Sequence, residues 1–442
     1  MKIELPEKVK LLLNTIQEGG YEAYVVGGCV RDSLLGRIPD DWDITTSATP
    51  MQIKALFHRT IDTGIQHGTV TVMLDREGFE VTTYRIDGKY EDSRHPKEVL
   101  FTPNLREDLR RRDFTINAMA YNEKEGMVDL FGGMEDLRLG KICCVGDAEA
   151  RFKEDALRIM RAVRFSAQLG YEIEDKTARA IEKLAPTLEK ISAERIQTEL
   201  VKLVTSPNPD FLETAYRYGV TKIILPEFDR AMETEQKHPH HCYSVGKHIL
   251  YSMKEVAPEK VLRLSMLFHD LGKPQVKTVD ENGTDHFRGH AAVSEKLAEK
   301  ILHRLKFDND TIRQVTRLVY YHDYGNGVTP TDTIVRRALN QIGEDLFPLF
   351  LQVRQADLKA QSLYQREEKQ ANLDAWEKKY EEICRRKDCV SLKTLAVTGS
   401  DLIACGMKPG KELGETLNKM LQIVLEDPKK NQKEILLALL PL

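Results

Sequence analysis

A change of pattern near residue 148 constrains the fold of this 442-residue chain more than any other feature. Before that point, short apolar and β-branched runs alternate with turn residues, whereas helical periodicity dominates the remainder. Hydrophobic residues make up 41% of the chain, enough for a sizeable core, and no apolar run approaches the roughly 20 residues of a membrane span. We therefore expect a cytoplasmic protein with an α+β head, built on a small mixed β-sheet with helices, and an all-α remainder.

Local signals place the individual elements of this architecture. Residues 6–18 are predicted to form an amphipathic helix that ends at Gly19-Gly20. The predicted strands are Tyr24–Val26, Asp41–Thr45 and a hairpin of Thr69–Leu74 with Phe79–Ile86. The polar segment 87–104 is predicted to be a mobile loop. The predicted helices are Val30–Leu35, 149–169, 175–185, 193–204 and 209–218.

Charge and cysteine content limit the class of protein. A net charge of -4 argues against a uniformly basic nucleic-acid coat, although a local basic groove remains compatible with it. Seven cysteines without a C-x-x-C pair indicate free thiols in a reducing compartment rather than a disulfide framework or a zinc site.

Two aspartates separated by one residue carry the strongest local signal. In a strand, Asp41 and Asp43 would point to the same face, and paired carboxylates suit a hard cation such as Mg²⁺. Such sites activate the attacking oxygen and stabilise the leaving oxygen in phosphoryl transfer. Glu80, on the second hairpin strand, would supply a third carboxylate or only support the site. Taken alone, an Asp-x-Asp is more often a solvated turn.

A glycine turn precedes these aspartates in the sequence. The run Gly27-Gly28-Cys29-Val30-Arg31 places the end of a strand, a turn and the start of a helix in order. Glycines let the backbone approach a phosphate, and a helix N-terminus adds partial positive charge. Arg31 would add a charge-assisted hydrogen bond. The order strand, glycine turn, helix and Asp-x-Asp is far more specific than either piece alone.

Together these segments resemble the nucleotidyltransferase head of class II tRNA nucleotidyltransferases and bacterial poly(A) polymerases. The run from Gly27 to Arg37, followed by Asp41-x-Asp43, carries the resemblance, and the runs EVTTYR at Glu80–Arg85 and RRDFTINA at Arg111–Ala118 extend it. The resemblance implies that Asp41 and Asp43 hold Mg²⁺ with Glu80 beside them. It also implies a nucleotide site that engages the sugar and triphosphate, with Gly28, Arg31, Arg112 and Asp113.

A predicted helix after Arg151 carries charged residues at helical spacing. Glu154, Arg158 and Arg161 fall on one stripe with Phe165, and Asp155 lies beside it. One interpretation is an exposed helix laced by ion pairs. The other is base recognition, because Asp can accept from the amine of C or A while Arg donates to the ring nitrogen. Such a pair would reject U and G.

The resemblance supports base recognition. In the family, E-D-x-x-R acts as a protein template for CTP and ATP, and the matching residues are Glu154, Asp155 and Arg158. Arg161 and Arg164 occupy further nucleotide- and phosphate-contacting positions. Poly(A) polymerases tend to carry proline where this chain has Ala156, and members that add only two cytidines tend to lack an intact flexible loop. The full loop at 87–104, with Asp92-x-Arg94-His95-Pro96, therefore favours complete CCA synthesis.

Nine of the twelve histidines lie between His238 and His322. Imidazole and carboxylate ligands suit Ni, Mn, Fe or Co, and also Zn, and six of them could hold two metals that activate water for phosphoester hydrolysis. The pattern resembles the HD phosphohydrolase superfamily, found after the neck in some tRNA nucleotidyltransferases. We interpret His238, His240, His241, His286 and His303 as peripheral. The predicted metal ligands are His248, His269, Asp270, His290, His322 and Asp357.

The C-terminal segment carries glycines and lysines between two predicted helices. A plain glycine-rich turn is one interpretation. The segment also resembles the C-terminal part of the same nucleotidyltransferases, where body and tail hold the tRNA elbow through backbone and phosphate contacts. The candidate RNA-binding residues are Gly406, Lys408, Gly410 and Lys411. The predicted domains are a head (1–145), a helical neck (146–230), an HD metal-binding domain (231–365) and a helical body and tail (366–442).

The resemblance covers nearly the whole chain and predicts a CTP/ATP:tRNA nucleotidyltransferase. Such an enzyme adds or repairs the 3′-terminal CCA of tRNA without a nucleic-acid template, using Mg²⁺ and releasing pyrophosphate. Its partners would be tRNA with an immature or damaged 3′ end, CTP and ATP, with no membrane and an oligomeric state that the sequence leaves open. The alternatives are an A-adding enzyme, a poly(A) polymerase, or an HD metal phosphohydrolase acting on RNA ends. The intact Asp-x-Asp disfavours a non-catalytic RNA chaperone.

Overall fold

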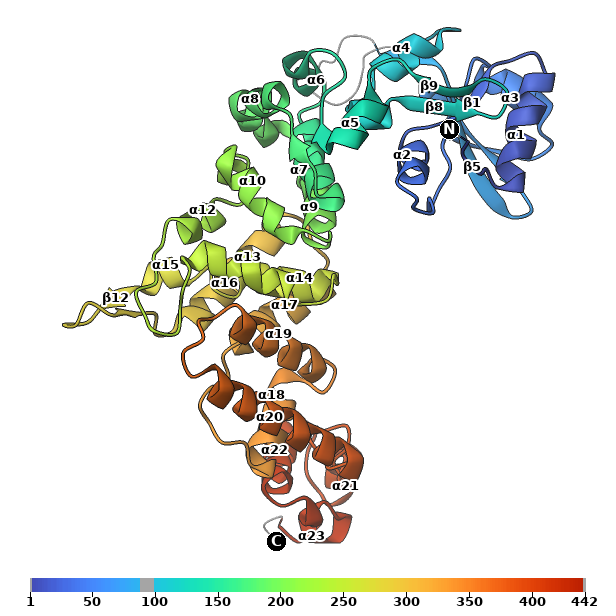
Figure 1. The fold of residues 1–442 in the computed structure, drawn as a ribbon. Coiled ribbons are helices and arrows are strands. Elements are labelled where there is room, and N and C mark those ends of the chain that lie inside the picture. The colour runs from blue at the N-terminus through green and yellow to red at the C-terminus, as the bar shows by residue number, and fades with distance from the viewer. Residues whose placement is uncertain (1, 88–98, 440–442) are drawn as a thin grey trace. The chain divides into compact units, whose positions relative to one another are not determined.

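The chain forms two compact units that meet in sequence at Pro226 and Glu227 (Figure 1). A computed structural model describes residues 2–87 and 99–439. The N-terminal unit holds the sheet and the helices that follow it, and the C-terminal unit is helical apart from one short hairpin. This agrees with the predicted α+β head and helical remainder. The predicted domain boundaries inside each unit stay predictions.

A seven-stranded mixed sheet forms the centre of the N-terminal unit. Its strand order is β3-β4-β5-β2-β1-β8-β9. The pairing of β2 with β5 is parallel, and the other neighbours are antiparallel. The strands are β1 (Ala23–Val26), β2 (Ile44–Thr46), β3 (Thr60–Gly64), β4 (Thr69–Leu74), β5 (Glu77–Thr83), β8 (Met119–Asn122) and β9 (Gly126–Asp129).

Two strand predictions need correction. The strand predicted over Asp41–Thr45 begins only at Ile44, because its partner β1 ends at Val26 and the chain turns away at Gly27. The segment 87–104, predicted as a loop, contains β7 (Val99–Phe101), which pairs with β6 (Arg85–Asp87). The apolar residues of Val99–Phe101 prefer a strand, and this preference outweighs the turn-forming residues on either side of them. The predicted loop motif from Asp92 to Pro96 lies outside the described residues.

The helix predicted over 149–169 is in fact two helices. α6 (Ala148–Glu154) and α7 (Leu157–Leu169) are separated at Asp155, whose backbone is extended. The Asp155 carboxylate accepts a hydrogen bond from the backbone N–H of Leu157 at 3.0 Å and thereby caps α7. The same carboxylate pairs with Arg195, so a contact distant in sequence fixes this break.

The other elements of the N-terminal unit surround the sheet and the α6–α7 pair. Their bounds confirm most of the predicted helices, including residues 6–18, 175–185 and 193–204. They are α1 (Glu7–Glu18), α2 (Gly28–Leu34), α3 (Pro50–Leu56), α4 (Leu105–Arg110), α5 (Gly133–Leu139), α8 (Asp175–Leu184), α9 (Ala193–Val204), α10 (Leu212–Arg217), α11 (Thr221–Ile224) and the paired β10 (Lys141–Ile142) and β11 (Glu172–Ile173).

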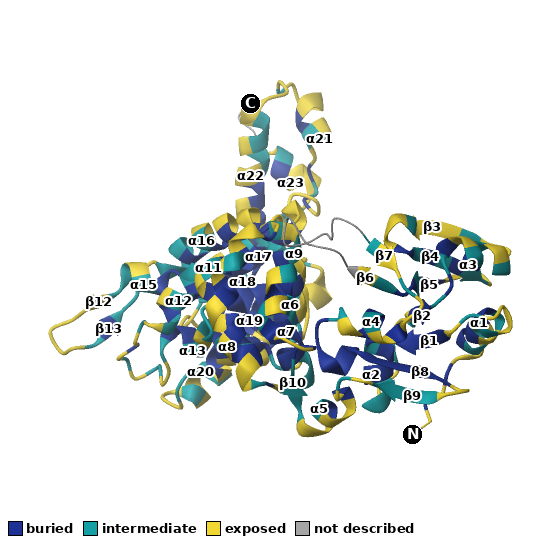
Figure 2. Ribbon diagram, turned by 90° about the horizontal axis from the view of Figure 1, so that it is seen from above, coloured by how far each residue is buried: buried dark blue, intermediate teal, exposed yellow. Residues whose placement is uncertain are grey.

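The C-terminal unit packs helices around a core that includes Phe347, Phe350 and Trp376. Figure 2 shows buried residues gathered along α18 and α19. No helix among residues 2–87 and 99–439 combines the length and apolar character that a membrane span requires. The helices are α12 (Pro226–Met232), α13 (Val245–Lys254), α14 (Lys260–Phe268), α15 (Lys273–Val276), α16 (His290–Arg304), α17 (Asn309–Tyr321), α18 (Asp332–Ile342), α19 (Phe347–Lys359), α20 (Arg366–Arg386), α21 (Gly399–Ala404), α22 (Lys411–Glu426) and α23 (Lys433–Leu437), and the hairpin is β12 (Thr278–Val279) with β13 (Asp285–His286).

Candidate functional site

Three carboxylates meet where β2 begins beside β5. The parallel register sets Ile44 opposite Val81, so Asp43 comes level with Glu80. Desolvation raises the pKa of Asp43, and the negative charges of Asp41 and Glu80 raise it further, whereas Arg112 lowers it. Carboxylates that repel one another in this way favour a divalent cation, whose charge would relieve the repulsion. The donor set therefore fits the predicted Mg²⁺ site.

The glycine turn lies against the guanidinium of Arg112. Gly27 has a φ of +84°, and a Cβ built on it would lie 2.9 Å from Arg112 Nη1. Glycine is therefore needed here both for the left-handed backbone and for the close approach. The Arg112 Nε is buried and has no hydrogen-bond partner among the described residues. An unpaired guanidinium N–H beside the turn favours an anionic ligand.

Arg31, predicted to bind the triphosphate, is held by protein groups. Its Nε and Nη2 pair with both carboxylate oxygens of Asp32, at 2.9 and 2.8 Å. Its Nη1 donates to Asn117 Oδ1 at 2.7 Å. The prediction missed Asn117, although it belongs to the RRDFTINA run that carried the resemblance.

Asp113, predicted to contact the nucleotide, connects the head to α7. Arg161 Nε donates to its Oδ2 at 2.7 Å, and Asn117 Nδ2 donates to its Oδ1 at 3.2 Å. Burial alone would raise the pKa of Asp113, but the Arg161 guanidinium outweighs it and lowers the pKa to about 2. Arg31, Asn117, Asp113 and Arg161 thus form one continuous polar network.

Three arginines surround the ring of Phe165 on α7. The guanidinium carbons of Arg164, Arg31 and Arg161 lie 3.9, 5.1 and 5.3 Å from the ring centroid. The ring quadrupole attracts each cation, so it partly offsets their mutual repulsion. Arg164 also donates to Glu199 on α9 at 2.5 Å. Three guanidinium groups, each paired with a carboxylate, are thus gathered around one ring.

The predicted base-reading residues lie on both sides of the α6–α7 break. Glu154 Oε2 accepts from Arg158 Nη1 at 2.6 Å, and Arg158 Nη2 donates to the Arg111 carbonyl at 2.9 Å. Asp155 Oδ2 accepts from Arg195 Nη2 at 2.7 Å. Sequence reasoning missed Arg195, which lies on α9, because nothing in the local pattern links it to Asp155. Arg158 therefore contacts the backbone next to Arg112. Arg195 on α9 holds the Asp155 carboxylate in place within the N-terminal unit.

Four histidines of the C-terminal unit are oriented by the same kind of hydrogen bond to the backbone. Each ring nitrogen Nδ1 lies within hydrogen-bond distance of a backbone carbonyl, which holds that nitrogen protonated and leaves Nε2 as the ligand atom. The Nδ1-to-carbonyl distances are 3.3 Å for His248 and Ala360, 2.7 Å for His269 and Met266, 2.9 Å for His290 and Phe287, and 2.7 Å for His322 and Val319.

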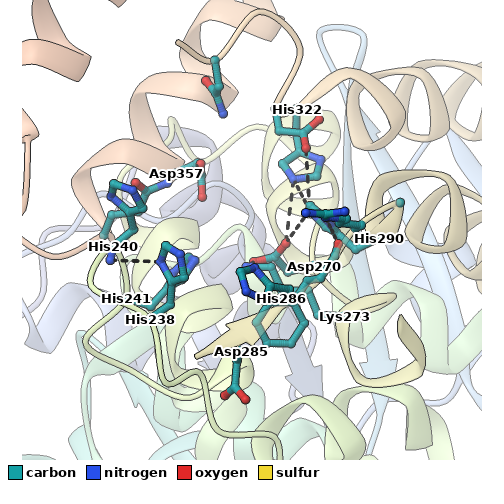
Figure 3. A pocket seen from close by; sticks show the side chains of 16 residues that line it. His238, His240, His241, Asp270, Lys273, Asp285, His286, His290, His322 and Asp357 are labelled. Atoms are coloured by element: carbon teal, nitrogen blue, oxygen red, sulfur yellow. Dashed lines mark hydrogen bonds and ion pairs between the residues drawn. The ribbon is translucent and has the colours of Figure 1, made fainter. Parts of the chain in front are cut away.

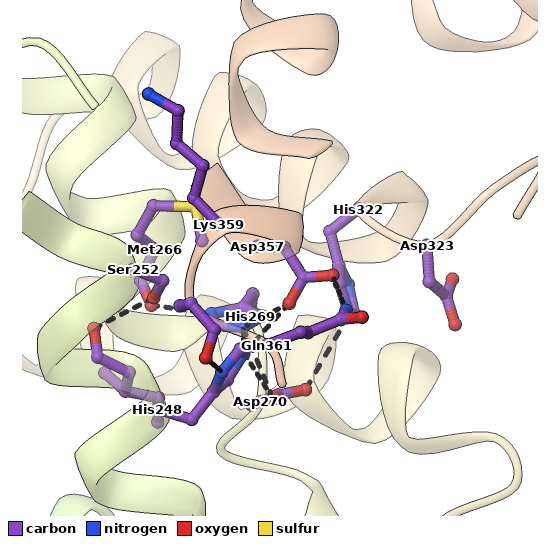
Figure 4. A network of polar contacts seen from close by, with 12 residues as sticks. His248, Ser252, Met266, His269, Asp270, His322, Asp323, Asp357, Lys359 and Gln361 are labelled. Carbon is purple, nitrogen blue, oxygen red and sulfur yellow. Dashed lines mark hydrogen bonds and ion pairs between the residues drawn. The ribbon is translucent and has the colours of Figure 1, made fainter. Parts of the chain in front are cut away.

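The four Nε2 atoms form two close pairs around Asp270, and Figure 4 shows three of these histidines, His248, His269 and His322, with Asp270. The Nε2 atoms of His248 and His269 lie 3.2 Å apart, and those of His290 and His322 lie 3.1 Å apart. Asp270 Oδ2 lies 3.3 Å from His269 Nε2, and its Oδ1 lies 3.3 Å from His290 Nε2. Two imidazole acceptors at this distance need a proton or a cation between them. The donor set therefore fits two divalent metal ions, one held by His248, His269 and Asp270 and the other by Asp270, His290 and His322.

Asp357 and Lys273 complete the surroundings of Asp270. Asp357 Oδ1 lies 2.8 Å from His248 Nε2, on the side of the first histidine pair. Lys273 Nζ lies 2.7 Å from Asp270 Oδ2. Although burial opposes it, the positive charges of His269 and Lys273 hold the pKa of Asp270 well below its usual range. All six predicted ligands thus meet at one place, together with a lysine that the prediction did not include.

A cavity of about 340 Å³ opens onto this cluster. Figure 3 shows His290 and His322 beside Asp270, with His238, His240 and His241 across the cavity. Those three residues and His286 line the cavity, and their interpretation as peripheral to metal binding stays a prediction. Spacing along the chain did not reveal their place at the cavity, because the segment after α12 folds back over the cluster.

The predicted RNA-binding residues lie in the turn between α21 and α22 and, for Lys411, at the first position of α22. Gly406 and Gly410 have φ values of +93° and +154°, and both are exposed. The side chains of Lys408 and Lys411 are exposed as well, and Lys411 Nζ lies 3.6 Å from Glu415. The structure shows an accessible basic turn, and its role in RNA binding stays a prediction.

Known protein families match three parts of the chain. The Poly A polymerase head domain matches residues 23–143. The probable RNA and SrmB-binding site of polymerase A matches residues 170–232. The family described as tRNA nucleotidyltransferase domain 2, putative, matches residues 287–440.

Whole-length relatives extend these matches. A CCA-adding enzyme of Lactobacillus helveticus is 38% identical over 97% of this chain and 94% of its own length. A CCA-adding enzyme of Ligilactobacillus salivarius is 35% identical over 98% of this chain and 95% of its own length. The crystal structure of the Bacillus stearothermophilus CCA-adding enzyme in complex with CTP is 30% identical, covers 98% of this chain and 96% of its own, and has a TM-score of 0.73.

Proposed function

Since the chain belongs to the CCA-adding enzyme family, we propose that it adds or repairs the 3′-terminal CCA of tRNA, using CTP and ATP. One observation of the structure supports this most directly. Arg158, half of the predicted base-reading pair, donates to the backbone carbonyl of Arg111, next in sequence to Arg112, whose Nε has no hydrogen-bond partner among the described residues. Base selection and triphosphate binding would therefore occur side by side in the N-terminal unit.

The reaction would be attack of the terminal ribose hydroxyl of tRNA on the α-phosphate, with pyrophosphate leaving. Asp41 and Asp43, supported by Glu80, would hold Mg²⁺, which supplies charge neutralisation for the attacking and leaving oxygens. Arg112 would bind the triphosphate through its unpaired Nε, with Gly27 and Gly28 allowing close approach. Arg161 and Arg164 would add positive charge around Phe165. Positioning and electrostatics supply most of the rate in reactions of this kind.

Base selection would depend on fixed side chains of the neck. Asp155 would accept from the amine of C or A, and Arg158 would donate to the neighbouring ring nitrogen. Glu154 orients Arg158, and Arg195 orients Asp155, so neither group needs to reorganise when a nucleotide binds. U and G would leave buried polar groups unpaired, which is the strongest way a site rejects an analogue.

Extension of three tRNA transcripts tests the product directly. The transcripts end before CCA, after the first C and after CC, and each receives CTP and ATP separately and together. We expect each transcript to be completed to CCA and then to stop. Extension of only the CC-ended transcript by one A would assign an A-adding enzyme instead, and continued addition of A would assign a poly(A) polymerase.

Exchange of Asp155 for Asn tests the template pair. The carboxamide keeps the shape but presents an N–H₂ donor, so we expect kcat/KM for CTP to fall about 100-fold and the preference for CTP over UTP to fall by a similar factor. Single-turnover incorporation of each nucleotide measures both. The matched variant Arg195→Gln leaves the carboxylate in place and should reduce the rate with a smaller loss of preference. An unchanged CTP/UTP ratio in Asp155→Asn would show that other residues select the base.

A second activity is proposed for the C-terminal unit, because two Nε2 pairs face one bridging carboxylate. His248, His269, Asp270 and Asp357 would hold one divalent transition metal, and Asp270, His290 and His322 a second. Ni, Mn, Fe or Co suits this donor set, and such a pair would activate water for hydrolysis of a phosphoester. The four backbone carbonyls at Nδ1 keep the ligands oriented. We propose phosphohydrolase activity on RNA ends or small phosphoesters.

Two further predictions remain proposals. The exposed turn from Gly406 to Lys411 would hold tRNA through phosphate contacts, which read shape rather than sequence. We also propose a cytoplasmic location, since all seven cysteines are free thiols, as expected in a reducing compartment.

A further inference from the structure

A fully buried carboxylate of the head lies between two elements of the proposed nucleotide site. Asp108 is on α4 and is 0% exposed. Its Oδ1 accepts from Arg111 Nε at 2.9 Å, and its Oδ2 accepts from Thr45 Oγ1 at 3.0 Å. The Thr45 hydroxyl lies farther, at 3.3 Å, from the Thr82 carbonyl. Arg112 Nη2 lies 3.7 Å from the same Oδ2, so one carboxylate faces two neighbouring arginines and a threonine of β2.

The two arginines would repel each other without this carboxylate. Although burial raises the pKa of Asp108, the guanidinium groups of Arg111 and Arg112 outweigh it and lower that pKa. Burial lowers the pKa of Arg112, and Asp108 is the carboxylate that opposes this most. Of the other two nearby carboxylates, Asp43 would hold the metal and Asp113 pairs with a guanidinium of α7. Asp108 is therefore the group that keeps two like charges side by side.

The guanidinium of Arg112 is held along one edge. Its Nη2 faces Asp108, its Nη1 lies against the glycine turn at Gly27, and its Nε has no hydrogen-bond partner among the described residues. An anion that binds at Nε would therefore meet a guanidinium whose position depends on Asp108. Small displacements of a binding group cost much of its effect on a reaction that relies on positioning.

Thr45 joins the same carboxylate to the strand that follows the metal-binding aspartates. Asp43 lies two positions before it and already accepts from the backbone N–H of Val26, so the two side chains share one face of the extended chain. The hydrogen bond from Thr45 to Asp108 is buried, because both residues are 0% exposed. The position of α4 against β2 therefore sets the separation between Asp43 and Arg112.

We propose that Asp108 is a positioning residue for the incoming nucleotide. It holds Arg112 against the glycine turn and, through Thr45, keeps this guanidinium in register with the metal-binding end of β2. The metal and the triphosphate then meet one fixed arrangement of charge, which needs no reorganisation when they bind. This inference rests on the proposed nucleotidyl transfer and adds a buried residue that acts only through Arg112.

Equilibrium binding separates positioning from a merely structural role. The probes are CTP, ATP, pyrophosphate and CMP, titrated calorimetrically with Mg²⁺ into the full-length protein without tRNA. We expect Asp108→Asn to weaken the first three about thirtyfold and Thr45→Val to weaken them about threefold. CTP and ATP should lose the same factor, because Arg112 contacts no base. CMP lacks the β- and γ-phosphates and should change by less than about twofold.

Thr46→Val is the matched control for folding. Thr46 is as buried as Thr45 on the same strand, but its hydroxyl donates to the Glu22 carbonyl at 2.6 Å. This variant should lower Tm at least as much as Thr45→Val does and leave CTP affinity unchanged.

A double variant tests whether Asp108 acts through Arg112. In the Arg112→Met background, the triphosphate-binding guanidinium is already absent. Adding Asp108→Asn to it should therefore weaken CTP binding by less than about twofold more.

Three results would overturn the inference. They are unchanged CTP affinity in both Asp108→Asn and Thr45→Val, equal losses for CMP and CTP, and a full effect of Asp108→Asn in the Arg112→Met background. Failure of the proposed function is a separate result, in which no tRNA transcript is extended while CTP binding and its dependence on Asp108 persist. A native chain that bound no CTP would overturn both.

Discussion

Exchange of Asp43 for Asn is expected to reduce nucleotide incorporation at least about a thousandfold, which corresponds to about 4 kcal/mol of transition-state stabilisation. The amide keeps the size of the side chain but removes the charge that would hold Mg²⁺ between Asp41 and Glu80. Removing one charge from three mutually repelling carboxylates should leave the stability of the fold unchanged or slightly higher. Incorporation of labelled CTP into a tRNA transcript lacking CCA, under single-turnover conditions, measures the loss.

The exposed neighbour Asp40 supplies a matched control. Asp40→Asn makes the same chemical change outside the three-carboxylate group and should retain nearly all incorporation. If Asp43→Asn kept more than about a tenth of the activity, the reactive centre would have to lie elsewhere in the chain.

Exchange of Asp270 for Asn should remove both proposed metals at once. Asp270 belongs to each of the two ligand groups, so neither group remains complete without its carboxylate. We expect metal affinity to fall at least about a hundredfold, and hydrolysis of 2′,3′-cyclic AMP to be lost with it. Metal content after dialysis, measured by mass spectrometry, and a phosphate-release assay provide the two readouts. Nucleotide incorporation should persist, because its carboxylates belong to the other unit.

Asp323 serves as the control for that experiment. It lies 4.0 Å from His290 Nε2 at the rim, and it belongs to neither ligand group. Asp323→Asn should retain both metal equivalents. If Asp270→Asn and Asp323→Asn lost the same amount of metal, the ions would be held by the overall negative charge of the site and not by direct ligation to Asp270.

Much of the candidate site follows from residue types and their order along the chain. The meeting of the six predicted ligands at one place could be anticipated because the ordered set of histidines and aspartates resembles the HD superfamily. Glu80 could be placed because a hairpin was evident on both sides of Asp75–Gly78, and the parallel pairing of β2 then brought it beside Asp43. These inferences needed only local patterns and the resemblance of neighbouring motifs.

Contacts between distant segments account for what could not be predicted. Glu154, Asp155 and Ala156 are all compatible with a helix, and Arg195, forty positions away, holds the Asp155 carboxylate at the break. Arg354 lies on a buried helix face, where its residue type alone gives no indication that its Nε and Nη1 have no hydrogen-bond partner among the described residues. The position of His241, whose ring centroid lies 5.7 Å from that of His248, depends on how the chain folds back after α12. Each of these features depends on tertiary structure that periodicity does not report.

The six predicted ligands come from different helices, so metal binding would affect the stability of the C-terminal unit. They come from α13, α16 and α19 and from the ends of α14 and α17, so bound ions would cross-link most of the helices between His248 and Asp357. A ligand that binds only the folded state adds about 2.7 kcal/mol to its stability at a hundred times its Kd. Metal starvation would then lower the unfolding temperature of the C-terminal unit and leave that of the N-terminal unit unchanged. In a cell short of these ions, the C-terminal unit would unfold more readily, even if no phosphoester were ever hydrolysed.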